Sequence, residues 1–535
     1  MQCTCVRQTD LPNTSKLYSD LIYRFDRVED LYAGPPNNID VIAQAARFSF
    51  PDDRRAALIN ALTPLNEGNP SLAELARPGA VAIVTGQQVG LFSGPAYTVY
   101  KALTAIRIAR GLAERGVPAV PVFWLATEDH DFAEIDHTWV FSADYRPVRL
   151  HIESAESNGA RPVGGLPLGD IPIDQLRSAL AGLPFADEAV ALVERAYMPG
   201  ETSPGQTSPG QTMGSAFATF IRELFAPYGL LLIDPMEPAI RAIAAPLMRE
   251  AVERMPELAE ALIARSGELV ERGYHAQVLV DHKTSLAFLL EDGHRIALRR
   301  SGDVFSAPRR KYSTAELAAN AEHLSPNALL RPVIQDYLLP TAAYVGGPAE
   351  LAYLAQSQVL YKKLLGRQPV AFPRAGFTLL DERAARRMAK YRLNPADLFV
   401  PERLLRERVA RQLIPPDLSR RLEETKDSFR RAFDALESDL RRFDVSLAGA
   451  VGTGRRKIEY QAAKMARKTE AQMLLKDQQA QRDTSALHGL VFPEDHLQER
   501  LYSIVPFLAK FGPGLVPEIY EHVRVECPDH QFATV

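Results

Sequence analysis

Ala80-Val81-Ala82-Ile83-Val84-Thr85-Gly86-Gln87-Gln88 is the stretch that decides the fold, and Gly90-Leu91-Phe92-Ser93-Gly94-Pro95 follows it. A short, nearly continuous apolar run that ends in glycine is typical of a strand buried on both faces of a parallel sheet. Residues 95–115 have helical periodicity, and a second apolar run ends at Phe123-Trp124-Leu125-Ala126. The stretch therefore predicts one strand–helix–strand unit of an open α/β sheet.

Two later apolar runs extend this sheet. Residues 229–235 form a short apolar run capped by an acid and a proline, and residues 369–374 have the same character. Arg374 stands at the carboxyl end of the last run, where its guanidinium is expected to hold an anion. We therefore predict an α/β fold with a parallel-sheet core.

A third stretch repeats the pattern of the first. Residues 331–337 are followed by Ala342-Ala343-Tyr344-Val345-Gly346-Gly347-Pro348-Ala349-Glu350 and a helix over residues 351–365, in the order strand, glycines, proline, helix. Paired glycines let a backbone approach a ligand closely, and proline suits a first helical turn. The helix N-terminus is expected to offer free N–H groups to a carboxylate or phosphate.

Changes in composition divide the chain further. One insertion contains residues 202–206 repeated as 207–211, which indicates a flexible surface loop. A second contains Asp292-Gly293 and Gly302-Asp303, which predict tight hairpin turns. The predicted segments are N-terminal helices with the first half of the core, 1–136; a first insertion, 137–228; continued core, 229–276; a small β-rich insertion, 277–330; the second half of the core, 331–393; and a coiled-coil hairpin with C-terminal helices, 394–535.

The C-terminal segment has a seven-residue apolar repeat. Leu422, Phe429, Leu436 and Phe443 recur at this spacing, and a basic helix follows them. We expect the glycine-containing residues 449–454 to turn the chain between two antiparallel helices. An apolar seam that a lone hairpin cannot fully cover predicts a homodimer through this coiled coil.

Composition excludes several classes of protein. The 535 residues are 46% apolar and 24% charged with a formal net charge of -4, a balance that attracts neither nucleic acid nor an anionic membrane. The first thirty residues lack the apolar core of a signal peptide, and no stretch approaches the ~18 uninterrupted apolar residues that a membrane span needs. We therefore expect a cytoplasmic protein that acts on small molecules.

The three cysteines, Cys3, Cys5 and Cys527, lie at the two ends of the chain. They are too few for a disulfide framework or a four-ligand zinc site. Cys3 and Cys5 stand in a polar stretch that we expect to be mobile and to have no catalytic role, although a thiol pair is the alternative.

Polar residues follow the first two predicted strands. Gly86, Gln87 and Gln88 end the first strand, and Glu128-Asp129-His130-Asp131 follows the second. In open α/β sheets the ligand crevice lies beyond the carboxyl ends of the strands. These residues are therefore expected to face one pocket, which is the predicted active site.

Within that pocket we assign His130 as the candidate base, because imidazole titrates near neutral pH. Asp129 or Asp131 is expected to orient the ring, and Glu128 completes the catalytic cluster. The same residue types also serve as solvated helix caps without any catalytic role. No second ligand pair with metal spacing accompanies the cluster, so no metal is predicted.

Longer motifs carry a family resemblance. They are Thr85-Gly86-Gln87-Gln88-Val89-Gly90-Leu91-Phe92-Ser93-Gly94-Pro95-Ala96-Tyr97-Thr98, Phe123-Trp124-Leu125-Ala126 with Glu128-Asp129-His130-Asp131, Leu330-Arg331-Pro332 through Gln335-Asp336-Tyr337, and Tyr344-Val345-Gly346-Gly347-Pro348-Ala349-Glu350. In order and spacing they closely resemble the bacillithiol-forming cysteine-adding enzymes. The resemblance continues through Pro373-Arg374, the coiled-coil segment and residues 497–512, so it covers nearly the whole chain.

The resemblance implies a Rossmann-like core with connecting-peptide insertions, an α-helical coiled-coil domain and a homodimer. It also implies a ligase for the last step of bacillithiol synthesis, in which the carboxyl group of L-cysteine is joined to the amine of glucosaminyl malate. The predicted substrate-binding residues are then Gly86, Gln87, Gln88, Tyr97, Gln335, Tyr344, Gly346, Gly347, Glu350 and Arg374.

Amide formation from a free carboxylate needs an activated leaving group, so ATP or ADP is the expected nucleotide. The sequence leaves an adenylate, an acyl phosphate and a carrier-bound cysteine open. The resemblance also links the core to nucleotidyltransferases with His-Ile-Gly-His and Lys-Met-Ser-Lys-Ser signatures, and neither occurs here. The alternative function is a non-catalytic nucleotide-binding scaffold or sensor dimer, with a shallow strand-end crevice and its best pocket beside the coiled coil.

Overall fold

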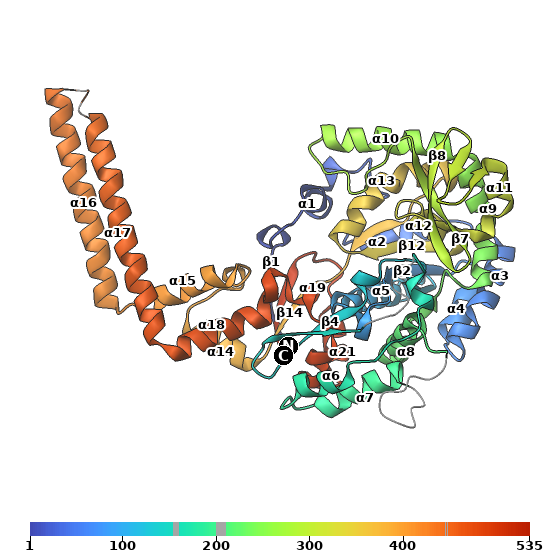
Figure 1. Cartoon of the computed structure of the whole chain (residues 1–535), viewed down its shortest axis with the longest axis horizontal. Helices are drawn as coiled ribbons and strands as arrows, with labels where there is room; N and C mark the ends of the chain where they lie inside the picture. The colour runs from blue at the N-terminus through green and yellow to red at the C-terminus, as the bar shows by residue number, and fades with distance from the viewer. Residues whose placement is uncertain (153–159, 199–209, 445, 447) are drawn as a thin grey trace. The chain divides into compact units, whose positions relative to one another are not determined.

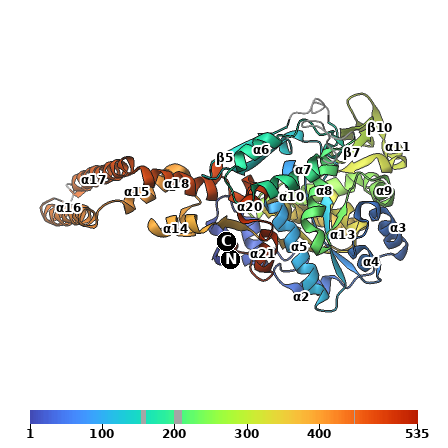
Figure 2. The same cartoon turned by 90° about the horizontal axis from the view of Figure 1, so that it is seen from below.

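The computed structural model describes residues 1–152, 160–198, 210–444, 446 and 448–535. Most of the tandem repeat predicted as a loop therefore lies outside the described residues. Figures 1 and 2 trace the chain, and no helix in its described part combines the length and apolar character needed to cross a membrane. The chain forms two compact units, the first comprising Met1–Ala143, Pro147–Thr378 and Glu499–Ala533, and the second Asp144–Arg146, Leu379–Gln498 and Thr534–Val535.

The first unit is built on a five-stranded sheet whose neighbouring strands are all parallel. Its order is β13-β12-β2-β3-β6, so the winding reverses between β2 and β12. This is the place where α/β sheets open a ligand crevice. The sheet confirms the predicted parallel core. Its strands are β2 (Val81–Gln87), β3 (Ala119–Leu125), β6 (Leu231–Ile233), β12 (Thr341–Gly346) and β13 (Val370–Pro373).

Strand β2 is buried on both faces, as its unbroken apolar run predicts. Ala82 and Val84 pack into one apolar core, and Val81 and Ile83 pack into a second. Because side chains alternate along a strand, a fully apolar strand needs cover on both sides. Helices provide that cover, and α5 packs directly against β2 and β3. The core helices are α5 (Tyr97–Ala113), α9 (Pro238–Glu253), α10 (Met255–Glu271), α12 (Arg331–Leu338) and α13 (Pro348–Leu364).

The third sequence stretch divides into helix, strand and helix. Its strand is β12, and Pro348 stands at the start of α13 as predicted. Residues 331–337 belong to helix α12, which carries Pro332 in its first turn, where proline is tolerated because that N–H has no helical partner.

Two insertions interrupt the core. In its described part the first contains an antiparallel strand pair and three α-helices, and the second contains an antiparallel sheet of order β10-β9-β8-β7-β11. Asp292, Gly293 and Gly302 have positive φ in its turns, which confirms the predicted hairpins. The elements are β4 (His137–Phe141), β5 (Pro147–His151), α6 (Ile173–Leu180), α7 (Ala186–Tyr197), α8 (Met213–Phe225), β7 (Thr284–Glu291), β8 (His294–Ser301), β9 (Val304–Ser306), β10 (Lys311–Ser313), α11 (Thr314–Ala319) and β11 (Leu324–Pro326).

The N-terminal stretch is a strand, so the expectation that it is mobile is wrong. Strand β1 lies beside β15 in a sheet of order β1-β15-β14, and backbone pairing orders a segment whose side chains are mostly polar. The remaining terminal elements are β1 (Gln2–Val6), α1 (Lys16–Tyr23), α2 (Ile39–Ala45), α3 (Asp52–Leu62), α4 (Ser71–Ala76), β14 (Phe377–Leu380), α19 (Gln498–Leu501), α20 (Val505–Phe511), α21 (Leu515–His522) and β15 (His530–Thr534).

The second unit contains the predicted helical hairpin. Helices α16 and α17 lie side by side in Figures 1 and 2, and Arg455 pairs with Asp434 across them at 2.8 Å. Residues 449–454 lie inside α17, so their prediction as the turn is wrong. A Cβ at Gly454 would lie 3.4 Å from the Phe433 ring, and glycine there lets the two helices approach closely. The helices are α14 (Glu382–Lys390), α15 (Glu402–Gln412), α16 (Pro416–Phe443), α17 (Ala448–Lys476) and α18 (Gln478–Val491).

Candidate active site

The carboxyl ends of β2, β3 and β12 open into a cleft of about 720 Å³ within the first unit. It lies where the winding of the sheet reverses. The structure brings residues from separate sequence stretches together here. The predicted site residues in its lining are Gly86, Gln87, Gln88, Tyr97, Glu128, Asp129, His130, Tyr344, Gly347, Glu350 and Arg374.

Three predicted residues lie outside this lining. Gln335 is fully buried in α12, where its amide donates to Asp336 Oδ1 at 3.1 Å. Gly346 ends β12, and a Cβ there would lie 3.0 Å from the Tyr344 ring, so packing explains the glycine. Asp131 is exposed in the loop after β3. The structure therefore gives none of the three a place against a ligand in the cleft.

Strand β2 approaches β3 closely at Gly86. A Cβ at Gly86 would lie 2.7 Å from the carbonyl oxygen of Trp124, its partner in register. Glycine is therefore needed at this position, and Gln87 and Gln88 follow it into the cleft. Gln88 Nε2 donates to Asp129 Oδ2 at 2.7 Å, which ties the end of β2 to the loop after β3.

Sequence reasoning missed Lys101, a lysine on α5 whose side chain is 2% exposed. Its ammonium donates to the Gly86 carbonyl oxygen at 3.0 Å and to Gln87 Oε1 at 2.8 Å. Nζ also lies 2.5 Å from Glu350 Oε2. A buried ammonium is tolerated only when it is paired and hydrogen-bonded, and all three contacts meet that need. The available signal was one lysine among the buried, mostly apolar residues 98–106.

Glu350 is the carboxylate that pairs with Lys101 at the edge of the cleft. Its carboxylate accepts the Gly347 N–H and the Tyr344 hydroxyl, each at 2.8 Å. Burial alone would raise the pKa of Glu350, but the Lys101 charge and these hydrogen bonds hold that pKa below its usual value. The Gly347 N–H is thus occupied, and the expectation that it is free for a ligand is wrong. Glu350, the third residue of α13, caps the N-terminus of this helix instead.

Arg374 follows β13 and forms an ion pair with Glu499 of α19. The sequence analysis did not predict Glu499. The guanidinium lies 2.5 Å from Glu499 Oε1, donates to the Ala375 carbonyl oxygen at 2.9 Å, and sits 5.1 Å from the Tyr97 ring centroid. Burial alone would lower the pKa of Arg374, but Glu499 raises it. The neighbouring Arg500 also lines the cleft and is exposed. Within the described part of the chain its guanidinium has no hydrogen-bond or ion-pair partner, so its donors are available to an anion.

The opposite half of the cleft is formed by the loop after β3 and by Arg295 of β8. Asp129 Oδ1 accepts the His130 backbone N–H at 2.7 Å and lies 3.4 Å from Arg295 Nη1. Burial alone would raise the pKa of Asp129, but the hydrogen bonds from Gln88 and from His130 lower it. Asp129 is therefore a fixed carboxylate. Sequence reasoning missed Arg295 because it belongs to the β-rich insertion.

The His130 ring faces Arg295. Its Nδ1 lies 3.1 Å from Arg295 Nη1 and 3.6 Å from Asp129 Oδ1. Arginine can only donate, so the shorter contact makes Nδ1 the acceptor and assigns the ring proton to Nε2. The ring centroid also lies 5.6 Å from that of Phe288, over which Arg295 stacks at 4.0 Å. In this arrangement His130 has an N–H donor, not a lone pair, at its second nitrogen.

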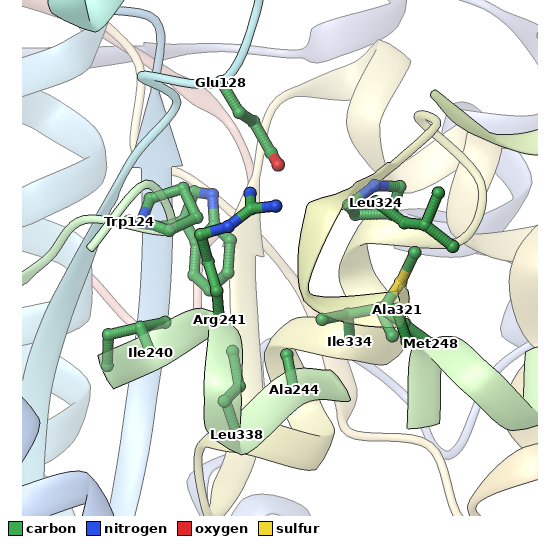
Figure 3. A pocket seen from close by; sticks show the side chains of 12 residues that line it. Trp124, Glu128, Ile240, Arg241, Ala244, Met248, Ala321, Leu324, Ile334 and Leu338 are labelled. Atoms are coloured by element: carbon green, nitrogen blue, oxygen red, sulfur yellow. The ribbon is translucent and has the colours of Figure 1, made fainter. Parts of the chain in front are cut away.

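Glu128 lies between the cleft and a smaller cavity of about 20 Å³, and it is 4% exposed. Oε2 accepts the Ser325 hydroxyl at 2.9 Å, whereas Oε1 has no hydrogen-bond partner among the described residues. Figure 3 shows the Glu128 carboxyl end and the Arg241 guanidinium directed toward one another in this cavity, which has room for one water molecule. Burial raises the pKa of Glu128, and the charges of Arg295 and Arg241 offset only part of that effect.

The cleft thus joins a cationic half, built by Lys101, Arg374 and Arg500, to a half that contains carboxylates and an imidazole. Such a site suits a ligand that carries both carboxylates and an amine. In the part of the chain that the structure describes, no group of three or more His, Cys, Asp or Glu side chains is arranged to hold a metal ion.

Two family models match the chain. "Bacillithiol biosynthesis BshC, N-terminal Rossmann-like domain" matches residues 1–375, and "Bacillithiol biosynthesis BshC, C-terminal coiled-coil domain" matches residues 377–535. Together they confirm the predicted Rossmann-like core and coiled-coil domain.

Similar proteins span the whole chain. A relative from Solibacter usitatus named "Putative cysteine ligase BshC" is 49% identical over 536 residues, which cover 100% of both chains. Relatives of the same name from Koribacter versatilis and Salinibacter ruber are 34% and 31% identical. Their alignments cover 99% of both chains in the first case, and 97% of this chain and 96% of the relative in the second.

Proposed function

Because the chain belongs to the BshC family of bacillithiol biosynthesis, we propose that it is a ligase that joins the carboxyl group of L-cysteine to the amine of glucosaminyl malate. This reaction is the last step of bacillithiol formation. The observation that carries the proposal is the 720 Å³ cleft in which fixed cations and carboxylates meet at the reversal of the sheet. Its volume lies in the ordinary range for small-molecule sites, roughly 300–1,000 Å³.

The charges of the cleft suit the two substrates. Glucosaminyl malate carries two carboxylates and an ammonium group, and cysteine carries one of each. We assign a malyl carboxylate to Arg500, because the Arg374 and Lys101 cations are already engaged by Glu499 and Glu350. Each of those two cations is balanced by its carboxylate, so the guanidinium of Arg500, which is unpaired among the described residues, is the charge that favours an anion in the cleft.

The amine of glucosaminyl malate must lose a proton before it can attack a carbonyl carbon. We predicted His130 as the base, but a ring that accepts from Arg295 has no lone pair at Nε2. We therefore propose Glu128 as the proton acceptor, because its Oε1 is unpartnered and its raised pKa makes it a stronger base. His130 then contributes an N–H donor to the substrates.

Activation of cysteine is proposed to consume ATP, because a free carboxylate lacks a leaving group. An adenylate releases AMP on amide formation, whereas formation of an acyl phosphate yields ADP. A carrier-bound cysteine consumes neither in this step. The nucleotide product therefore separates the three routes.

The alternative, a non-catalytic nucleotide-binding scaffold or sensor, predicted a shallow crevice at the strand ends. The observed cleft is large, polar and lined by residues from several core strands and helices. That geometry favours the ligase, because a scaffold has no need for buried charges that converge on one space.

We further propose a cytoplasmic homodimer assembled through the coiled coil. Phe429, Leu436 and Met465 are 40%, 47% and 61% exposed on α16 and α17. Large apolar side chains exposed along a heptad repeat favour burial against a second copy.

The reaction is tested by incubating the pure protein with L-cysteine, glucosaminyl malate and ATP, and following bacillithiol, AMP and ADP by mass spectrometry. The expected result is bacillithiol formed in step with one nucleotide product. Glu128→Gln is expected to abolish most turnover, whereas Glu253→Gln, which removes an exposed carboxylate of α9, retains it. A folded protein that makes no bacillithiol from free or activated cysteine would contradict the proposal and favour the scaffold.

A further inference from the structure

The cysteines lie where the two ends of the chain meet. Cys3 and Cys5 belong to β1, which lies beside β15, and Cys527 stands just before β15. The N-terminal end is anchored, because the Met1 ammonium lies 2.6 Å from Glu518 Oε1. Residues that are farthest apart in the sequence are therefore neighbours in the fold.

Cys5 lies beside the segment that carries Cys527. Arg524, three residues before Cys527, places its Nη1 3.9 Å from Cys5 Sγ. Gln8 Nε2 donates to the Pro528 carbonyl oxygen at 2.9 Å, which fixes the two segments beside one another. Cys5 is exposed and Cys527 half-buried, so a small solute can reach the pair from solvent.

We propose that Cys5 and Cys527 form a thiol-exchange site that reacts with low-molecular-weight disulfides and closes into an intramolecular disulfide. The Cys5 thiolate attacks one sulfur of a disulfide RSSR, a Cys5–SR bond forms, and the RS–SR bond breaks with departure of one thiolate. Cys527 then attacks Cys5 Sγ and expels the second thiolate. The two leaving thiolates take up the two thiol protons, and the protein has passed two electrons to RSSR. Because the segments that carry the two cysteines lie side by side, the second step is intramolecular.

The electrostatics set the rate of the first step. Burial and the neighbouring Cys527 raise the pKa of Cys5, while Arg524 opposes that shift. The thiolate is the attacking form, so the rate is expected to rise about tenfold per pH unit below that raised pKa. Arg524→Gln removes the opposing charge and is expected to slow the exchange at neutral pH.

The reaction class connects the site to bacillithiol. If the ligase function holds, the reaction in the cleft produces a low-molecular-weight thiol. The oxidised form of that thiol is a low-molecular-weight disulfide, the class of substrate that we propose for the thiol-exchange site. Only this connection rests on the proposed function, because the exchange itself requires nothing of the cleft.

The test uses the full reduced chain and glutathione disulfide as the probe. We expect two equivalents of glutathione to be released, a protein mass lower by two hydrogen atoms, and proteolytic peptides joined through Cys5 and Cys527. Cys3→Ser is the matched control and should close in the same way. Cys527→Ser should stop at a mixed disulfide on Cys5. Closure should raise the melting temperature, and dithiothreitol should reverse it, because the bond constrains nearly the whole unfolded chain.

Three results would overturn the proposal. They are a stable mixed disulfide on the wild-type protein, a bond between Cys3 and Cys5, and closure that persists after Cys527→Ser. Because the readout is the linkage itself, it stands apart from the ligase assay. Failure to form bacillithiol would contradict the proposed function and leave the linkage result unchanged.

Discussion

Replacing Lys101 with methionine tests how the cleft is held together. Methionine nearly preserves the length and packing of the side chain, but it leaves Glu350 buried without its cation. Removing one partner of a buried ion pair costs roughly 3–5 kcal/mol. The Glu350 side chain is 22% exposed and solvent screens part of its charge. We therefore expect a loss of unfolding free energy at the lower end of that range, about 3 kcal/mol. For a unit of this size that loss lowers the melting temperature by roughly 3–4 °C.

The pH dependence has a defined sign. The folded-state pKa of Glu350 lies below 4.5, so the ion pair stabilises the protein fully above the unfolded pKa and loses its effect as the pH falls through the folded value. The deficit of Lys101→Met should therefore be complete at pH 7 and shrink below pH 4.5. Thermal unfolding of Lys101→Met, of Glu350→Gln and of the double variant, at pH 7 and below pH 4.5, measures this loss of stability. If the two substitutions destabilise additively, the reasoning is refuted, because a coupled pair requires the double variant to lose less than the sum.

Four further outcomes are expected. Glu128→Gln should lower turnover by roughly 10²–10⁴ and raise the melting temperature, because it removes both a base and a buried charge. Wild-type turnover should fall as the pH drops through the raised pKa of Glu128. The pH–rate profile of Glu128→Gln should lack this acidic decline. Leu436→Arg should convert the proposed dimer to a monomer in light scattering, since this residue is 47% exposed on α16. Gly86→Ala should destabilise the fold by roughly 1–3 kcal/mol in urea unfolding, because its Cβ would lie 2.7 Å from the Trp124 carbonyl oxygen.

The sheet was predictable because its signal is local. Unbroken apolar runs ending in glycine or a polar residue identify buried parallel strands, and the polar residues that follow mark the ligand edge. Gln88 and Asp129 were predicted from two different runs, and the structure joins them by a 2.7 Å hydrogen bond. Strand order adds nothing to that prediction, because all parallel strands share the edge at which they end.

Lys101, Arg295 and Glu499 were not predictable, because their signal is a contact and not a pattern. Each comes from a helix or an insertion that has no motif of its own, and each meets a partner far away in the sequence. The prediction that Gln335 binds substrate has the opposite problem. This residue belongs to a motif, but its side of α12 faces the interior.

The glycines at 449–454 show why composition misled the prediction of the turn. Glycine costs about 1 kcal/mol relative to alanine inside a helix, so a cluster of glycines suggests a break. In this hairpin the absent Cβ of Gly454 makes room for Phe433, and packing between the helices outweighs the propensity.

The buried ion pairs of the cleft call for a reason other than stability. Replacing such a pair with well-packed apolar residues is often neutral or stabilising, so the fold alone does not require Lys101–Glu350 or Arg374–Glu499. What both pairs do is fix the positions of charges that line the space between β2 and β12 before any ligand arrives. Charges already fixed in place need no reorganisation when a carboxylate binds or when charge develops on a reacting carbonyl. Helix α19 contributes twice to this arrangement, because Glu499 locks Arg374 while the adjacent Arg500 stays free for an anion. The Rossmann-like segment alone, residues 1–375, therefore lacks part of its own cleft.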